Sequence, residues 1–281
     1  MRAGAMLLGL AGLGLCLANP LWALSFHATL DPIELTAKPG ESATRQFQLT
    51  LKEGEPTTHF RSHVQDFYRS EDQRQSFYLE PGDPDSPSRS CARWVSLAPV
   101  EATVQAGETM VVRQTITVPG DATPGGYWCV LTVDEVPDPL TNPPGVGIRF
   151  LASMSVGIFV YVPPVERRAR ILSIQIGPQQ AQLRIENDGN CPLRAVGRFE
   201  FLKPGTEAPT AVAVIPRTAV FPEPIKTAIL TADLPDAAAL PSGRYVVRAI
   251  LDIGLKHYIG AKNEVDIIRE EGQGAAPGAG R

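Results

Sequence analysis

The sequence lacks an excess of positive charge, and this removes one class of partner. Its 26 Lys and Arg residues are outnumbered by 30 Asp and Glu residues, for a formal net charge of −4. Proteins that bind nucleic acid carry a basic patch or stripe. The densest cationic stretch is Arg167, Arg168 and Arg170, and because Glu166 offsets part of its charge we interpret it as a solvated linker. We therefore expect no nucleic-acid partner.

Catalytic and metal-binding motifs are also missing. The sequence contains no Gly-x-Ser-x-Gly turn, which would present a nucleophilic serine, and no glycine-rich phosphate loop. It has four histidines. His59 and His63 are four residues apart, but Phe60 stands where a zinc-protease motif places glutamate. We predict that the protein is not an enzyme and binds neither a cofactor nor a metal.

Long hydrophobic runs are missing after the amino terminus. There, a positive Met1-Arg2 start, an apolar stretch from Met6 to Leu17 and a small residue at Ala23 are typical of a secretory signal peptide. The apolar stretch is too short for a membrane span, and the Gly/Ala-rich residues 271–281 are typical of a disordered tail. We expect residues 1–23 to direct export, and the mature protein to be periplasmic or secreted without a membrane anchor.

Cysteine is scarce, with four residues in the chain. Removal of the signal peptide leaves Cys91, Cys129 and Cys191. In an oxidising compartment we expect Cys91 and Cys129, which fall in the same predicted domain, to form a disulfide worth about 3 to 4 kcal/mol. Cys191 lies in a turn, and no histidine near it in sequence would lower its pKa. We interpret Cys191 as a semi-buried thiol rather than a nucleophile.

The abundant pattern is that of β-strands. No segment of the mature chain shows a long apolar helical period, and the longest strand pattern runs from Gly145 to Val162. Every second side chain in this stretch, at the even-numbered positions, is apolar, so a pleated strand would place these side chains on one face. We call this alternation the parity of the strand. These side chains include Ile148, Phe150, Ala152, Met154, Val156, Ile158, Val160 and Val162. Because Pro163 and Pro164 cannot donate to a sheet, we predict a first domain at residues 24–164, a hinge, and a second domain at residues 165–270.

Both predicted domains carry features of an immunoglobulin-like β-sandwich. In the first, Tyr127 follows a Pro-Gly-Gly corner and precedes Cys129 by two residues, which is the spacing of a tyrosine corner. The second domain contains about seven short strand patterns and a similar corner that ends at Tyr245. The two corner segments resemble each other, which favours two copies of one plan. The predicted fold class is all-β, with two immunoglobulin-like sandwich domains joined by a short Pro-Pro hinge.

The order of these features resembles the periplasmic fimbrial chaperone family. The resemblance is carried by the signal peptide, the immunoglobulin-like domain, the long strand that ends in Phe159-Val-Tyr-Val-Pro163, and the second sandwich. It implies a chaperone-like factor for pilus or surface-structure assembly, which binds a secreted or pilus-like protein subunit by strand addition. The series from Trp94 to Tyr127 is also similar to the peptidoglycan-binding domain of proteins that interact with WxL surface proteins. The alternative is therefore a cell-wall or glycan-binding module, with Trp94 or Trp128 as the stacking surface.

Two departures from the chaperone family concern how a subunit is held. Fimbrial chaperones anchor the subunit's terminal carboxylate with an Arg of the first strand and a Lys of the long last strand. Here Ser25 to Leu35 contain no Arg and Ser155 to Val162 contain no Lys. The long strand is the candidate docking edge, although its apolar parity is also what an interior strand paired on both sides shows. The predicted partner contacts are Arg149, Leu151, Ser153, Ser155, Phe159 and Tyr161.

Overall fold

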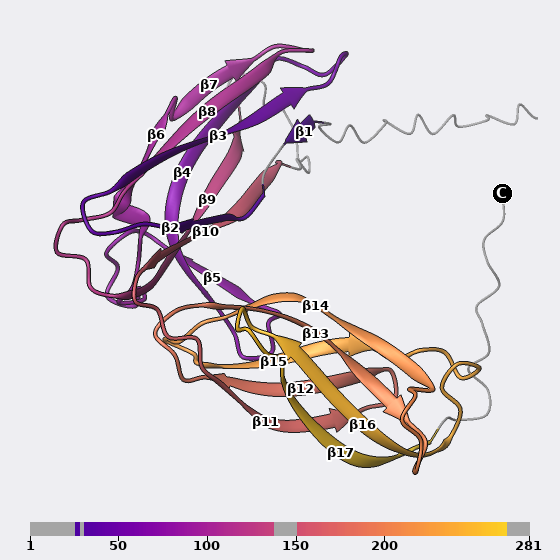
Figure 1. Cartoon of the computed structure of the whole chain (residues 1–281). Helices are drawn as coiled ribbons and strands as arrows, with labels where there is room; N and C mark the ends of the chain where they lie inside the picture. Colours follow the sequence, from indigo (N-terminus) through magenta and orange to yellow (C-terminus); the bar gives the residue numbers. More distant parts are fainter. Residues whose placement is uncertain (1–25, 29–30, 138–150, 269–281) are drawn as a thin grey trace, which may run out of the picture.

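The computed structural model describes residues 26–28, 31–137 and 151–268, and they form an all-β protein (Figure 1). The described strands between Phe26 and Val162 build a first sandwich, and those between Ala169 and Ile267 build a second. The helical content of this part of the chain is one 3₁₀ turn, Ala92–Trp94. Among the residues described, no helix is long and apolar enough to cross a membrane. The predicted fold class, two immunoglobulin-like sandwiches on either side of a Pro-Pro segment, is confirmed.

The first sandwich has two sheets that face each other. The strands of one sheet, in spatial order, are β1 (Phe26–Ala28), β3 (Ser42–Leu51), β8 (Thr109–Thr117) and β6 (Val95–Ala98). The strands of the other are β2 (Ile33–Thr36), β10 (Ser153–Val162), β9 (Gly125–Val136), β4 (Thr58–Arg69) and β5 (Ser76–Leu79), with β7 (Glu101–Val104) paired to β4. Strand β10, the last strand of this sandwich along the chain, therefore lies between β2 and β9.

Alternating side chains fill the space between these sheets. Along β8, Met110, Val112 and Ile116 are buried while the residues on the other face are largely exposed, because successive strand residues point to opposite faces. Strand β9 differs, since every residue from Gly125 to Val133 is buried. One face of β9 contributes to the core of the first sandwich, and Trp128 and Val130 on its other face pack toward the second sandwich.

The second sandwich repeats the plan with seven strands. Its smaller sheet consists of β11 (Ala169–Ile176), β12 (Gln180–Asn187) and β15 (Thr227–Asp233). Its larger sheet consists of β14 (Ala211–Val220), β13 (Leu193–Leu202), β16 (Gly243–Asp252) and β17 (Ile259–Ile267). Figure 1 shows this sandwich below the first, and residues 163–168 connect the two. The limits of the two domains stay a prediction.

Each sandwich contains a tyrosine corner. The hydroxyl of Tyr127, at the start of β9, donates to the carbonyl of Thr123 at 2.9 Å. The hydroxyl of Tyr245, on β16, donates to the carbonyl of Pro241 at 3.0 Å. Both bonds reach back four residues and tie the start of a core strand to the preceding loop. The two similar sequence segments thus adopt the same local structure.

Strand β10 begins later than the sequence pattern indicates. Leu151 and Ala152 precede it as irregular chain, and residues 145–150, which include Arg149, lie outside the described residues. Within β10 the predicted parity is confirmed, because Val156 and the apolar residues that alternate with it after that point are buried in the core of the first sandwich. The later members of this row are Ile158, Val160 and Val162.

Candidate functional site

Strand β10 is paired on both sides over only part of its length. On one side β9 runs antiparallel to it from Ser153 to Val162. On the other side β2 runs parallel to it and covers Ile158 to Tyr161. No strand in the described part of the chain pairs with Ser153–Gly157 on this second side. We call this unpaired side of Ser153–Gly157 the free edge.

Neighbouring hydrogen bonds show which backbone groups face the free edge. The carbonyl of Tyr161 accepts a 3.1 Å bond from Ala37, on the β2 side, whereas the carbonyl of Ala152 accepts a 2.8 Å bond from Glu135, on the β9 side. The N–H and C=O of one strand residue point the same way and alternate from residue to residue. The residues that turn both groups toward the free edge are therefore Ser153, Ser155 and Gly157.

The predicted contact residues on β10, together with Leu151 just before it, fall into an exposed and a buried group. Leu151, Ser153 and Ser155 are exposed, and both serine hydroxyls hydrogen-bond to side chains of β9. Phe159 and Tyr161 are only 2% and 4% exposed. They were predicted as partner contacts, but the protein itself encloses them between its two sandwiches. This corrects the prediction and leaves Leu151, Ser153 and Ser155 as its accessible members.

An apolar cluster, which we call the inter-sandwich core, joins the two sandwiches. Its members are Phe67, Trp128, Val130, Phe159 and Tyr161 of the first sandwich and Cys191, Ala219 and Phe221 of the second. Trp128 is fully buried, and its indole N–H donates to the carbonyl of Phe67 at 2.9 Å. Trp128 therefore cannot form the predicted glycan-stacking surface. Trp94 is half-buried and packs on Tyr127 with ring centres 4.3 Å apart.

Polar contacts add to the inter-sandwich core. The turn between β4 and β5 reaches the second sandwich, where the N–H of Ile229 donates to the carbonyl of Glu71 at 2.7 Å. The Glu71 carboxylate also pairs with Arg184 at 2.6 Å, and this hydrogen bond lowers the pKa of Glu71. Elsewhere, the Glu223 carboxylate accepts a 2.9 Å bond from the N–H of Arg89. These contacts hold the two sandwiches in a defined orientation.

The first residues of β9 approach the second sandwich at backbone distance. The N–H of Gly126 donates to the carbonyl of Asn190 at 2.8 Å. A Cβ atom at Gly126 would lie 2.5 Å from the Cβ of Cys191, which is closer than any van der Waals contact. Glycine at position 126 is therefore required for the sandwiches to meet in this way.

A pocket of about 260 Å³ between the sandwiches is lined by three arginines. The guanidinium of Arg167 lies 4.9 Å from the ring centre of Tyr161, and that of Arg194 lies 4.6 Å from the ring centre of Phe159. Burial is the largest cause that raises the pKa of Tyr161 to about 12, so its phenol stays neutral. We call this the arginine pocket, and Arg217 is its third cation.

Carboxylates balance part of this charge. Glu34 and Asp252 also line the arginine pocket. Glu34 lies 3.3 Å from Nε of Arg194, although the geometry of this contact does not make a hydrogen bond. Arg167 and Arg217 form no ion pair with any residue that the structure describes. Two guanidinium groups in the pocket are therefore available to an anion.

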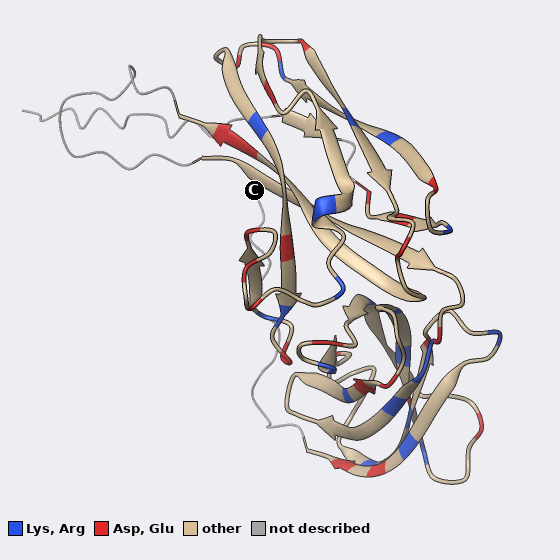
Figure 2. Ribbon diagram, turned by 90° about the vertical axis from the view of Figure 1, so that its left-hand side faces the viewer, with Lys and Arg blue, Asp and Glu red and all other residues tan. Residues whose placement is uncertain are grey.

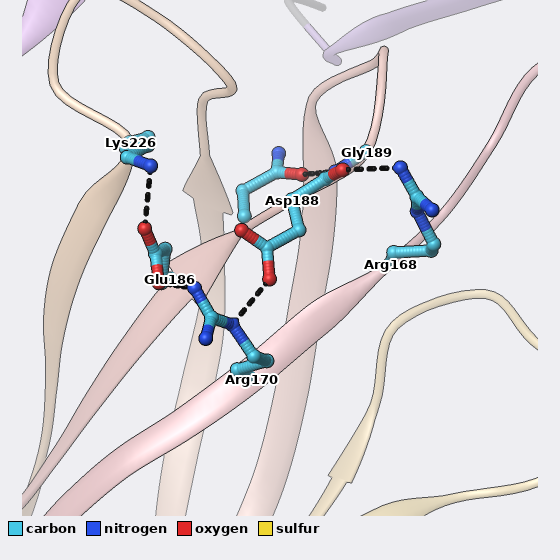
Figure 3. A network of polar contacts seen from close by, with 7 residues as sticks. Arg168, Arg170, Glu186, Asp188, Gly189 and Lys226 are labelled. Carbon is cyan, nitrogen blue, oxygen red and sulfur yellow. Dashed lines mark hydrogen bonds and ion pairs between the residues drawn. The ribbon is translucent and has the colours of Figure 1, made fainter.

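A polar network beside this pocket orders the loop between β12 and β13 (Figure 3). Arg170 donates to Asp188 at 2.5 Å and to Glu186 at 2.6 Å, and these carboxylates, Asp188 first, raise its pKa. Lys226 pairs with Glu186 at 2.7 Å, and Arg168 donates to the Asp188 carbonyl at 3.0 Å. Arg168 and Arg170 thus belong to an ordered network, while their side chains stay 67% and 65% exposed to solvent, as expected of a solvated linker. Figure 2 shows positive and negative residues interspersed on both sandwiches.

The three cysteines that follow the predicted signal peptide are buried and free. The sulfur atoms of Cys91 and Cys129 lie 2.7 Å apart, whereas a disulfide bond measures about 2.05 Å. The disulfide therefore stays a prediction. Burial raises the pKa values of Cys129 and Cys191, which disfavours the reactive thiolate. Cys191 is fully buried, and hence more enclosed than the predicted semi-buried thiol.

The histidines do not gather into a metal site. His59 lies 3.3 Å from Glu101, and His63 lies 3.5 Å from Asp134. Within the described ranges, no group of three or more His, Cys, Asp or Glu side chains is placed to hold a metal ion.

Sequence reasoning missed Arg194, Arg217 and Gln114. Arg194 and Arg217 lie on β13 and β14, and only the packing of the two sandwiches brings them to Arg167. No local pattern could reveal this. Gln114 did leave a signal, because it is the one polar residue in the core-facing row of β8 that otherwise contains Met110, Val112 and Ile116.

No protein-family model and no curated protein matches the chain. Among solved structures, the class 5 fimbriae chaperone CfaA is 13% identical, covers 84% of this chain and 98% of its own, and has a TM-score of 0.46. The Pseudomonas aeruginosa CupB2 chaperone is 14% identical over 86% and 100%, with a TM-score of 0.43. A chain of the Salmonella enterica SafA pilin complex with the SafB chaperone is 15% identical over 85% and 97%, with a TM-score of 0.44. These similarities concern architecture, and the functional conclusions below rest on this chain's own geometry.

Proposed function

We propose that the protein is an exported, non-enzymatic factor that binds a secreted subunit during assembly of a pilus or another surface structure. The subunit, called the client below, is held by strand addition. The observation that carries this proposal is the free edge, where Ser153, Ser155 and Gly157 direct N–H and C=O groups away from β9. An extended client segment completes these hydrogen bonds, while its alternate side chains supply selectivity.

The surroundings of the free edge support this use. The rest of β10 is paired with both β2 and β9 and is buried on both faces. The free edge is therefore held in an extended conformation before a client arrives. Binding to a preformed edge avoids most of the ordering cost on the side of the protein.

The arginine pocket supports a second contact with the client. Guanidinium groups bind carboxylates through paired N–H donors, and Arg167 and Arg217 are free of ion pairs in the described structure. Glu34 on β2 lines the arginine pocket and also the cavity beside the free edge, so one residue of β2 borders both sites. We propose that the arginine pocket receives a client carboxylate, in place of the Arg and Lys that the fimbrial chaperones use.

The competing glycan-binding function loses its main support, because Trp128 is buried in the inter-sandwich core. A protein client is the better match to an unpaired strand edge. The predicted signal peptide, residues 1–23, and tail, residues 271–281, lie outside the described residues. Export therefore stays part of the proposal.

A pair of substitutions at Ser155 tests strand addition. Ser155→Pro removes an N–H that faces the free edge and leaves the backbone hydrogen bonds to β9 in place, whereas Ser155→Ala keeps the N–H. Both variants lose the hydroxyl that hydrogen-bonds to Thr132 of β9, so they differ at the backbone N–H. The tagged full-length proteins are purified from exporting cells, and co-purifying proteins are identified by mass spectrometry. We expect wild type and Ser155→Ala to retain the same secreted subunit and Ser155→Pro to lose it. Equal retention by a folded Ser155→Pro variant would contradict strand addition.

A further inference from the structure

A polar cavity lies beside the free edge, between the two sheets of the first sandwich. Its volume is about 370 Å³, and its lining includes Val156 of β10, Ile33 of β2 and Gln114 of β8. Val156 belongs to the free edge segment, and Ile33 is the first residue of β2, opposite Ile158. The cavity therefore opens where β2 stops covering β10. We call it the Gln114 pocket.

Gln114 is expected to lower the stability of the protein at its position. It stands in the core-facing row of β8 and is 3% exposed. Its side-chain carbonyl oxygen Oε1 is buried, and no described residue donates a hydrogen bond to it. A buried acceptor without a donor is destabilising, and native structures contain few of them. An apolar residue such as its row neighbours Val112 and Ile116 would be more stable here, so the glutamine needs another explanation.

A second polar side chain lines the same cavity. Arg45 stands directly opposite Gln114 in the ladder between β3 and β8, and it lines the Gln114 pocket. It shares the core-facing row of β3 with Phe47 and Leu49, both of which are buried. One Arg45 N–H donates to the carbonyl of Thr44 at 3.1 Å, and its guanidinium makes no other hydrogen bond to the described residues. The cavity is thus lined by Gln114, whose acceptor is unsatisfied, and by Arg45, whose side chain is also exposed to solvent.

We propose that the Gln114 pocket is a selectivity site that receives a carboxamide side chain, Asn or Gln, from a strand added at the free edge. This inference rests on the proposed strand addition. An added strand alternates its side chains between two faces, so every second one points between the sheets as Val156 does. A carboxamide carries both a donor and an acceptor. Its NH₂ group donates to Oε1 of Gln114, and its carbonyl accepts from Arg45.

Other side chains complement the cavity less well. An apolar side chain leaves both Gln114 and Arg45 without a partner and adds the cost of their desolvation. A carboxylate has no proton to donate to Gln114 and is repelled by Asp31 and Glu34, which also line the cavity. An ammonium group has no acceptor for the N–H groups of Arg45. A site built to hydrogen-bond its ligand rejects analogues that lack the matching group. Gln114 therefore lowers the stability of the free protein and raises its selectivity for the client.

The test uses blocked nonapeptides of alternating Val and Thr that differ only in the central residue, which is Asn, Gln, Leu, Glu or Lys. Their affinity for the full-length mature protein is measured by calorimetry. We expect the Asn or Gln peptide to bind wild type about tenfold more tightly than the Leu peptide, as one or two satisfied buried hydrogen bonds imply. Gln114→Leu is expected to reverse this preference and to raise the thermal midpoint of the free protein.

A matched control lies in the second sandwich. Gln182→Leu makes the same change on β12, far from the free edge along the fold, and is expected to leave the peptide preference of wild type unchanged. Ser155→Pro, with Ser153→Pro at the first strand residue as a second variant, tests the edge itself. Thermal midpoints confirm that each variant is folded.

The outcomes separate the pocket from the edge. Equal affinity of wild type for all five peptides, together with lost binding in the proline variants, overturns the Gln114 pocket and leaves strand addition standing. Peptide binding that survives in both folded proline variants, or no binding of any peptide, overturns strand addition. A Gln114→Leu variant that is less stable than wild type and keeps the amide preference gives Gln114 a structural role and also overturns the inference.

Discussion

The two halves of β10 share one strand and one neighbour, β9, yet they have opposite environments. From Ile158 onward, β2 covers the second side and both faces are buried, one in the first sandwich and one in the inter-sandwich core. From Ser153 to Gly157 one side is open, and Ser153 and Ser155 are exposed. Continuous alternation along a strand therefore does not decide its role. What covers each segment divides β10 into a covered, structural half and an open half, which we propose as the docking half.

The largest difference between the halves is expected in stability. Phe159→Ala removes a fully enclosed ring from the inter-sandwich core and is expected to lower the free energy of unfolding by about 3 to 5 kcal/mol. Ser155→Ala in the open half removes a hydroxyl that hydrogen-bonds to Thr132 and is expected to lower it by only about 0.5 to 1.5 kcal/mol. Urea unfolding of both variants measures the two values. Similar losses would show that the halves are equally structural.

Oxidation is expected to reinforce only the structural half. Cys129 stands opposite Ile158 in the ladder, and its sulfur lies 2.7 Å from that of Cys91. A disulfide between them is expected to add about 3 kcal/mol to the stability of the oxidised protein relative to the reduced one. Alkylation of the unfolded, non-reduced protein followed by mass spectrometry checks the bond. Cys191 serves as the internal control and should be alkylated, whereas alkylation of Cys91 and Cys129 as well would rule the disulfide out.

A smaller effect on stability is expected where the second sandwich contacts the turn between β4 and β5. The side chains of Glu71 and Arg184 are 35% and 48% exposed, so solvent screens their ion pair and Glu71→Gln is expected to cost about 0.5 kcal/mol at neutral pH. Since the hydrogen bond from Arg184 lowers the pKa of Glu71 below its ordinary 4.5, the stabilisation is present above that pH. It is lost as the pH falls through the lowered pKa.

Unfolding of wild type and Glu71→Gln at a series of pH values checks this dependence. The gap between the two proteins should be constant above pH 4.5 and should close in more acidic solution. A gap that persists at low pH would assign the effect to packing of the turn rather than to the charge of Glu71.

The features that could be predicted from the sequence are local ones. The parity of β10 follows from neighbouring residues such as Val156 and Ile158, because side chains alternate in any strand. The tyrosine corners span four residues each and need no distant partner, as the bonds of Tyr127 and Tyr245 show. The fold class rests on the same kind of information, repeated along the chain.

The features that could not be predicted depend on distant segments. Which part of β10 is open depends on how far β2 extends, and Ile33 at its end is remote from Gly157 in sequence. The alternation along β10 places Phe159 on the face away from the core of the first sandwich, and the sequence therefore predicts contact with a partner. The sequence pattern does not show that the second sandwich covers this face, where Phe221 belongs to the same buried cluster as Phe159. Arg194 likewise lines the arginine pocket only because the second sandwich packs against the first.

Residue-resolved amide hydrogen exchange along β10 distinguishes an open edge from a covered one. The amides of Ser155, Gly157, Phe159 and Tyr161 all point to the same side of the strand, but only the last two face β2. We expect fast exchange at Ser155 and Gly157 and slow exchange at Phe159 and Tyr161 in the free protein, and we expect Ser155 and Gly157 to become protected when the client binds. Equal protection at all four amides in the free protein would contradict this expectation, because the edge would then already be covered.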